Sequence, residues 1–144
     1  MREPCKNLSL TCPSWRISEV ARSKRACDRA LFGGSVIRKA GVFTFPKILS
    51  NGNVEASLTL ASSTIPKAVL ISSGARANVW RHYVMTYDGT ALKVYVNGVL
   101  SRQTTSPGAV AVNGNPILIG SGFKGMLDEV AVLERALSAA EVLS

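Results

Sequence analysis

A single histidine is the chain's most obvious candidate for catalysis. His82 stands two residues after Trp80, and strand alternation would place both on the same face as Val84. The sequence holds no second histidine, and no serine or cysteine lies at a motif-like distance that would make it a nucleophile beside this imidazole. We therefore interpret His82 as a packed, hydrogen-bonded sheet residue and not as a general base or metal ligand.

Three acids close in sequence, Asp128, Glu129 and Glu134, are the second candidate for chemistry. A glycosidase needs two carboxyl groups about 5 Å apart for retention, or further apart for inversion. If residues 126–133 form a strand, Asp128 and Glu134 share a face but lie roughly 20 Å apart. This spacing argues against a glucanase-type site, and we predict a protein that is not an enzyme.

Arg102, Asn113 and Asn115 are the candidates for ligand binding, because together they could line a polar loop that holds sugar hydroxyls. The tetrapeptide Asn113–Pro116 is equally explained by turn chemistry, since Asn side chains bond their own backbone two residues on. Both interpretations stay open.

The tyrosines could offer a sugar-stacking surface. Tyr83 and Tyr87 share a strand face with Arg81. We expect this face to point outward if the alternating apolar residues of 92–96 are buried, and the alternative is that a layer of the sandwich covers it. Tyr95 lies in the next strand, opposite in alternation to those apolar residues.

These residues sit in a run of short predicted strands. Asp88-Gly89 and Asn97-Gly98 are dipeptides that tolerate positive φ in tight hairpin turns. The apolar and turn patterns predict strands over residues 35–39, 42–48, 54–60, 68–72, 80–87, 92–96, 99–104, 117–120 and 126–133. Ser138 and Glu141 form a capping-box signature, which predicts a helix at the end of the chain. Strands first and a helix last predict an antiparallel sandwich.

Positive charge is concentrated in the N-terminal part. Residues 1–40 hold nine Lys or Arg against three acids, a net of +6 within the +8 of the whole chain. This arm could contact nucleic acid or an anionic surface. We favour a solvated arm, because it interleaves no aromatic platform and matches no recognition motif. Helix formers between residues 14 and 31 predict a short helix or an irregular segment there.

All three cysteines, Cys5, Cys12 and Cys27, also lie in this arm. Their spacing matches no zinc pattern, which normally shows close cysteine pairs with a second pair or histidine partners. We interpret them as structural or incidental cysteines.

A set of short motifs in fixed order gives the chain a family resemblance. The motifs are Trp80-x-His82, Thr86-Tyr87-Asp88-Gly89, Tyr95-Val96-Asn97-Gly98, Ile119-Gly120, Phe123-x-Gly125-x-Leu127-Asp128-Glu129-Val130 and Arg135-Ala136-Leu137-Ser138-x-x-Glu141. In this order they resemble the laminin-G-like, concanavalin A-like domains, and most closely the version found in bacterial surface proteins and related to pentraxins. Residues 36–42 and 50–55 resemble the early hairpins of that domain, and nothing upstream of about Ser35 resembles it.

The resemblance implies an all-β fold, an antiparallel concanavalin A-like jelly-roll β-sandwich over residues 35–144 with a short C-terminal helix, preceded by a basic N-terminal arm of residues 1–34. It also implies a non-catalytic carbohydrate- or protein-binding adhesion module. The alternatives are a remnant glycoside hydrolase-like domain, or contact with nucleic acid or an anionic surface through the arm. Asp128 matches an acidic position that helps bind calcium in some relatives, so calcium is the one candidate cofactor. The alternative is that Asp128 bonds neighbouring backbone amides at a strand end.

The resemblance also bears on partners and location. Relatives of this type are usually extracellular, yet the N-terminal arm shows no apolar stretch that would form a signal peptide. No apolar run approaches the about 18 residues of a membrane span. Because no residues upstream of about Ser35 resemble the opening strands of the domain, unpaired sheet edges are expected. We predict that the N-terminal arm fills this gap, or that two chains pair edge to edge as a homodimer.

Overall fold

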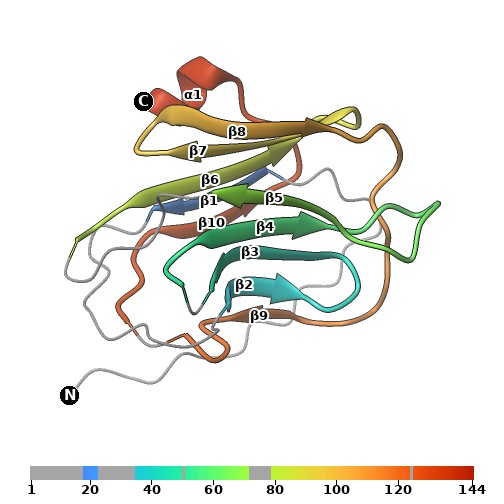
Figure 1. Cartoon of the computed structure of the whole chain (residues 1–144), viewed down its shortest axis with the longest axis horizontal. Coiled ribbons are helices and arrows are strands. Elements are labelled where there is room, and N and C mark those ends of the chain that lie inside the picture. The colour runs from blue at the N-terminus through green and yellow to red at the C-terminus, as the bar shows by residue number, and fades with distance from the viewer. Residues whose placement is uncertain (1–17, 23–34, 50, 72–78, 124) are drawn as a thin grey trace.

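Two five-stranded antiparallel sheets form the fold (Figure 1). The computed structural model describes residues 18–22, 35–49, 51–71, 79–123 and 125–144. The first sheet has the order β10 (Val130–Leu133), β1 (Ser18–Arg22), β6 (His82–Tyr87), β7 (Ala91–Val96), β8 (Val99–Thr105). The second has the order β5 (Lys67–Ile71), β4 (Val54–Leu58), β3 (Phe43–Ile48), β2 (Ser35–Lys39), β9 (Ile117–Ile119). Helix α1 (Ala139–Leu143) follows the last strand. The predicted antiparallel β-sandwich with a C-terminal helix is confirmed.

Strand β1 is the main departure from expectation in the N-terminal part. Residues 14–31 favour a helix by composition, but Ser18–Arg22 is a strand inside the first sheet, paired with β6 on one side and β10 on the other. Two strands that each present unpaired backbone groups override a weak local preference. The sandwich therefore includes residues upstream of 35, and β1 fills the gap that we expected the arm to fill. The three cysteines lie outside the described residues.

Strand ends agree with the sequence to within two residues, except at β10. The pattern predicts a strand from residue 126, whereas β10 begins at Val130. Glu129 has a φ of 50°, the left-handed region that no strand residue adopts. Asp128 therefore precedes the strand, so the expected alternation that relates it to Glu134 does not apply.

Between the sheets lies the main core, and the tyrosines of β6 point into it. Tyr83 pairs with Val96 and Tyr87 with Leu92, and paired residues of an antiparallel ladder share a face. Both tyrosines are buried in the inter-sheet cluster. The prediction that they face outward is wrong, because the register puts them on the same side as the apolar residues of β7. The largest fully buried side chains of the two sheets are Phe45, Ile37, Leu58, Met85 and Leu92.

Helix α1 covers the outer face of the first sheet. Val142 of the helix is 3% exposed and packs with Val84 of β6 and Tyr95 of β7, with Leu137 beside them. Figure 1 shows the helix lying next to β7 and β8 at the end of the molecule that carries the C-terminus. Tyr95 is therefore buried beneath the helix and offers no exposed ring.

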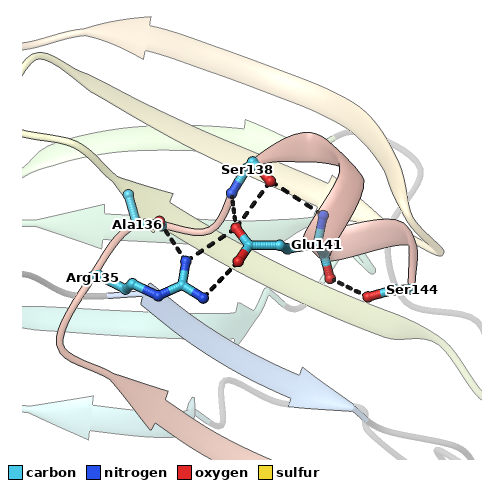
Figure 2. A network of polar contacts seen from close by, with 5 residues as sticks. All are labelled: Arg135, Ala136, Ser138, Glu141 and Ser144. Atoms are coloured by element: carbon cyan, nitrogen blue, oxygen red, sulfur yellow. Dashed lines mark hydrogen bonds and ion pairs between the residues drawn. The ribbon is translucent and has the colours of Figure 1, made fainter.

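A polar network fixes the start of α1 (Figure 2). The Ser138 hydroxyl accepts from the Glu141 amide at 3.3 Å, and the Ser138 amide donates to the Glu141 carboxylate at 2.8 Å. Arg135 donates to both oxygens of the same carboxylate, at 3.0 and 2.6 Å. The predicted capping box is confirmed, and the network positions Val142 over the sheet.

Two turns define the register of β6, β7 and β8. Asn97 and Gly98 both have positive φ, 51° and 80°, as a tight two-residue hairpin requires. Asn97 also accepts from the His82 amide through its side chain at 2.9 Å and donates its own amide to the His82 carbonyl at 2.8 Å. At the other end of the hairpin, the Asp88 carboxylate accepts from the amides of Thr90 and Ala91.

Tyr87 ties the loop after β8 to the β6–β7 turn. Its hydroxyl lies 2.7 Å from the Ser106 carbonyl oxygen and 2.6 Å from the Gly108 carbonyl oxygen. The loop amides complete this contact, since Ser106 donates to Thr90 and Gly108 to Gly89. The single phenolic proton is shared between these two carbonyl oxygens, so Tyr87 is the side-chain donor that holds the loop to β6.

The β-strands leave four sheet edges, at β10, β8, β5 and β9. On β8 both Val99 and Leu100 are exposed, followed by the exposed side chain of Arg102. A charged side chain on an edge strand disfavours pairing with another chain. Association of two chains at an edge stays a prediction. Among the described residues, no helix is long and apolar enough to cross a membrane.

Replacing Tyr87 by phenylalanine should destabilise the fold. The Tyr87→Phe change leaves loop carbonyls without their donor, so the free energy of unfolding should fall by about 1–3 kcal/mol. Tyr83→Phe is the matched control, because its hydroxyl bonds to none of the described residues. Urea denaturation of both variants and the parent chain gives the comparison. Equal stability of the Tyr87→Phe variant and the parent would contradict the role of this hydroxyl.

The free energy of unfolding should fall at acidic pH because the cap of α1 depends on an ionised Glu141. Hydrogen bonds from Arg135, then from Ser138, lower the pKa of Glu141 from 4.5 to about 2. Because the folded pKa lies below the unfolded one, the stabilisation is present above pH 4.5 and is lost as pH falls through about 2. An NMR titration of the side-chain carboxyl should find Glu141 still ionised between these values. Arg135→Gln should raise this pKa, and Arg102→Gln, remote from the cap, should not.

Candidate functional site

The residues predicted to bind a ligand do not form one site. Asn113 and Asn115 lie together, and both side-chain amides donate to the Ala40 carbonyl, at 2.7 and 3.0 Å. Asn113 also accepts from the Asn115 amide at 3.1 Å. Arg102 lies on β8, at an edge of the other sheet. Sugar binding by each of these residues stays a prediction, but they cannot act as one cluster in this arrangement.

The asparagine pair closes the β2–β3 turn against the loop that leads to β9. Lys39, 3% exposed, adds its ammonium group to this contact through a hydrogen bond to the Asn115 carbonyl. Gly41 has a φ of 75°, and an added Cβ there would lie 3.0 Å from the Asn113 amide nitrogen. The amide groups of this loop therefore serve the local fold, as turn chemistry predicts.

Asp128 lies in the loop before β10 with its side chain exposed. Its carboxylate accepts from the Glu129 amide at 2.9 Å, which is the bond expected of an aspartate at a strand end. Calcium needs about six to eight oxygen ligands. Within the described part of the chain, no three His, Cys, Asp or Glu side chains gather to hold a metal. The described side chains thus supply no carboxylate cage, and calcium binding stays a prediction.

His82 is the first residue of β6 and is half-buried. Both its backbone groups bond to Asn97 of the β7–β8 turn. These two hydrogen bonds hold the start of β6 to the β7–β8 turn, and the His82 imidazole lies at this junction. The same bonds restrain the backbone of Arg81, the preceding residue.

Three polar side-chain groups in residues 80–83 are buried without a hydrogen bond to any described residue. They are Trp80 Nε1, Arg81 Nε and the Tyr83 hydroxyl. Tyr83 is 5% exposed, and its ring meets Phe45 of the second sheet edge to face, with centroids 6.4 Å apart and planes at 85°. Buried polar groups are nearly always paired, so three unpaired groups within four residues call for an explanation.

The Tyr83 phenol is a hydrogen-bond donor at neutral pH. Burial raises the pKa of the Tyr83 phenol to about 12, and the nearby guanidinium of Arg81 lowers it by a smaller amount. Tyr83 therefore stays protonated at neutral pH. The cluster combines a cation with two neutral donors.

Arg81 differs from the other basic residues whose side chains the structure describes. Arg38 and Arg102 are exposed, whereas Arg81 is half-buried. Other cations have acidic partners, in the pairs Lys47–Glu55, Lys93–Asp88 and Arg135–Glu141. The buried ammonium group of Lys39 bonds instead to the Asn115 carbonyl. No described carboxylate pairs with Arg81.

Sequence reasoning missed this cluster because it placed the face of Tyr83 outward. A signal was present in the Asp88-Gly89 turn, which pairs Tyr87 with Leu92 when closed as a hairpin. That register alone puts Tyr83 on the buried face. The missing hydrogen bonds of Trp80 and Arg81 have no such signal, because partners depend on the whole fold.

Solved structures with the same fold include several binding domains. A putative carbohydrate binding protein from Bacteroides ovatus is 15% identical, with a TM-score of 0.75, over 95% of this chain and 42% of that protein. The binding domain of Paraclostridial Mosquitocidal Protein 1 is 16% identical, with a TM-score of 0.65, over 89% of this chain and 36% of that one. This chain thus spans less than half the length of either.

A third similar structure is closer in length. It is the Ruminococcus gnavus IT-sialidase CBM40 bound to α2,3 sialyllactose, 14% identical with a TM-score of 0.70, over 90% of this chain and 82% of that domain. At these identities the three structures establish the shared fold alone. No curated protein sequence matches the chain.

The family itself is established by sequence. A laminin-G-like family model, described as the concanavalin A-like lectin/glucanases superfamily, matches residues 17–143. The match begins upstream of residue 35, where we saw no resemblance, and it includes the residues of β1. The chain belongs to the concanavalin A-like lectin/glucanases superfamily.

Proposed function

We propose that this chain is a non-catalytic carbohydrate-binding module. The observation that carries the proposal is the concanavalin A-like sandwich, which matches the lectin/glucanases superfamily over residues 17–143. Similar folds occur in a putative carbohydrate binding protein and in a domain bound to α2,3 sialyllactose.

The indole ring of Trp80 also supports this proposal. The tyrosines of the described part, Tyr83, Tyr87 and Tyr95, are buried and cannot stack on a sugar from outside. Trp80 is half-buried, next in sequence to Arg81. Its indole combines an apolar ring with a polar N–H, the combination that suits a surface with one apolar and one polar side.

A remnant glycoside hydrolase is the competing proposal. It needs two carboxyl groups on either side of one glycosidic bond. Asp128 and Glu134 are separated by the whole of β10, and the Asp128 carboxylate bonds to a backbone amide. The described acids therefore favour a binding module. Contact with nucleic acid through residues 1–17 and 23–34 concerns a part of the chain outside the described residues and stays a prediction.

A glycan array probed with the whole chain tests the proposed function. We expect a defined set of glycans to be retained at physiological salt, where charge attraction from the +8 chain alone is screened over about 8 Å. The array is probed with calcium and with a chelator, because calcium binding at Asp128 stays a prediction. The heat-unfolded chain, which has the same charge, is the control. Failure to retain any glycan, with or without calcium, would contradict the proposal.

Hydrolysis is tested on the same protein. Incubation with β-glucans should release no reducing sugar. Turnover that the Asp128→Asn variant abolishes would favour the hydrolase instead.

A further inference from the structure

Strand β8 differs from the other sheet edges in its length. It has seven residues, whereas β5 has five, β10 four and β9 three. An edge strand presents unpaired backbone N–H and C=O groups, and most folds keep such strands short. Among the edges that the structure describes, β8 therefore offers the longest stretch of backbone to another strand.

Three exposed apolar side chains gather where β8 begins. Val99 is 68% exposed and Leu100 45%. Leu143 of α1 is 71% exposed and lies over the turn before them, since a Cβ added to Gly98 would be 2.8 Å from its Cδ1. Figure 1 shows α1 beside this edge. We call Val99, Leu100 and Leu143 the edge patch, and exposed apolar side chains that cluster in this way mark surfaces for a partner.

The edge patch continues a small core that is buried under the helix. Leu100 pairs with Tyr95 across the β7–β8 ladder, so the two side chains share a face of the sheet. Tyr95 is buried under α1 with Val84 and Val142. This small core is open at the β8 edge, where an apolar side chain of another molecule would extend it.

Arg102 gives the same edge a positive charge. Ser101 is the unpaired residue at the register shift between β7 and β8, and beyond it Arg102–Thr105 pair with β7 one residue after another. The Arg102 side chain is exposed, and none of the ion pairs within the described structure includes it. Opposite charges that face each other across a strand pair are favourable, so the complement of this position is an acidic residue.

We propose that β8 binds an extended acidic segment of another protein, which pairs with Arg102–Thr105 as a sixth strand of the first sheet. The segment places an acidic side chain opposite Arg102 and covers the edge patch with apolar side chains. Main-chain hydrogen bonds supply affinity in such strand addition, and the side chains supply specificity. The ligand is a protein, so this inference goes beyond the glycan-binding function proposed above.

A second copy of the chain fits this edge less well than an acidic segment. Antiparallel pairing of two β8 strands centred on Arg102 would set two arginines opposite each other, which is unfavourable. Pairing centred between Gln103 and Thr104 would leave the two edge patches uncovered at opposite ends. Both copies would also carry a net charge of +8. A lipid surface fits less well too, because it would remove water from the free backbone groups of β8 without pairing them.

Peptide selection on the full chain tests the inference. A phage-displayed library of random dodecapeptides is the probe, and we expect the enriched peptides to combine an acidic residue with apolar neighbours. The most enriched peptide is then synthesised and titrated. Its binding should weaken as the ionic strength rises. Hydrogen exchange of the complex should slow at the amides of β8.

A charge exchange at Arg102 tests the predicted contact directly. Arg102→Glu should weaken the synthetic acidic peptide by about fivefold or more, because an attraction becomes a repulsion. A peptide with lysine in place of its acidic residue should bind this variant better than it binds the parent chain. Arg38→Glu, an exposed arginine on β2 of the other sheet, is the matched control and should change affinity less than about twofold.

The contribution of the edge patch is measured separately. Leu143→Ser should weaken the peptide by about fivefold, because less apolar surface is buried in the complex. Ile65→Ser is the matched control, since Ile65 is 70% exposed in the loop between β4 and β5. If thermal unfolding shows that Leu143→Ser is not folded, Leu100→Ser takes its place.

Four outcomes would overturn the inference. Two of them are a failure to enrich any peptide over the uncoated surface, and enriched peptides whose affinity Arg102→Glu leaves unchanged. A dimer in sedimentation that Leu143→Ser dissociates would assign the edge to a second copy. Pelleting with vesicles of phosphatidylcholine and phosphatidylserine that depends on Leu143, without peptide binding, would assign it to a membrane. Glycan retention on the array is measured independently, so the failure of one proposal leaves the other standing.

Discussion

The register of β6 against β7 is the constraint on which the rest of the structure depends. It sends Tyr83, Met85 and Tyr87 between the sheets and leaves Val84 beneath the helix. A slip of one residue would exchange these two sets and expose the core face. Both ends of the hairpin resist such a slip, through the Asp88 carboxylate at one turn and Asn97 at the other. The helix, the loop after β8 and the position of Arg81 all follow from this register.

The parts that sequence reasoning predicted are those whose determinants lie close together in the chain. The Asn97-Gly98 turn and the cap formed by Ser138 and Glu141 are encoded within four residues, and the structure confirms both. Strand β1 is different, because Ser18–Arg22 carries no strand pattern of its own and finds its partners in β6 and β10, far along the chain. The left-handed φ of Glu129 likewise has no sequence signature, since glycine or asparagine would be expected there.

The candidate site shows the same division between local and distant determinants. Residue type alone suggested that Asn113 and Asn115 bind a ligand, but their amides serve Ala40, in a turn more than seventy residues earlier in the chain. Arg81 was not predicted to be a site residue, because an arginine beside a strand is common. What distinguishes it is a lack of partners within the described structure combined with partial burial. That property belongs to the fold and cannot be derived from neighbouring residues.

The polar side chains of the β6–β7 hairpin and of the helix cap differ in what they contribute to stability. Two carboxylates each accept several hydrogen bonds, Asp88 in the β6–β7 turn and Glu141 at the start of α1. The Asn97 side chain accepts from the His82 amide and so holds the β7–β8 turn to β6. These side chains stabilise the fold. Tyr83 lies against the same core and contributes a hydroxyl with no bond to the described residues, at a cost of about 1–3 kcal/mol relative to a paired group. The fold tolerates this loss of stability because β6 is hydrogen-bonded to β1 on one side and to β7 on the other.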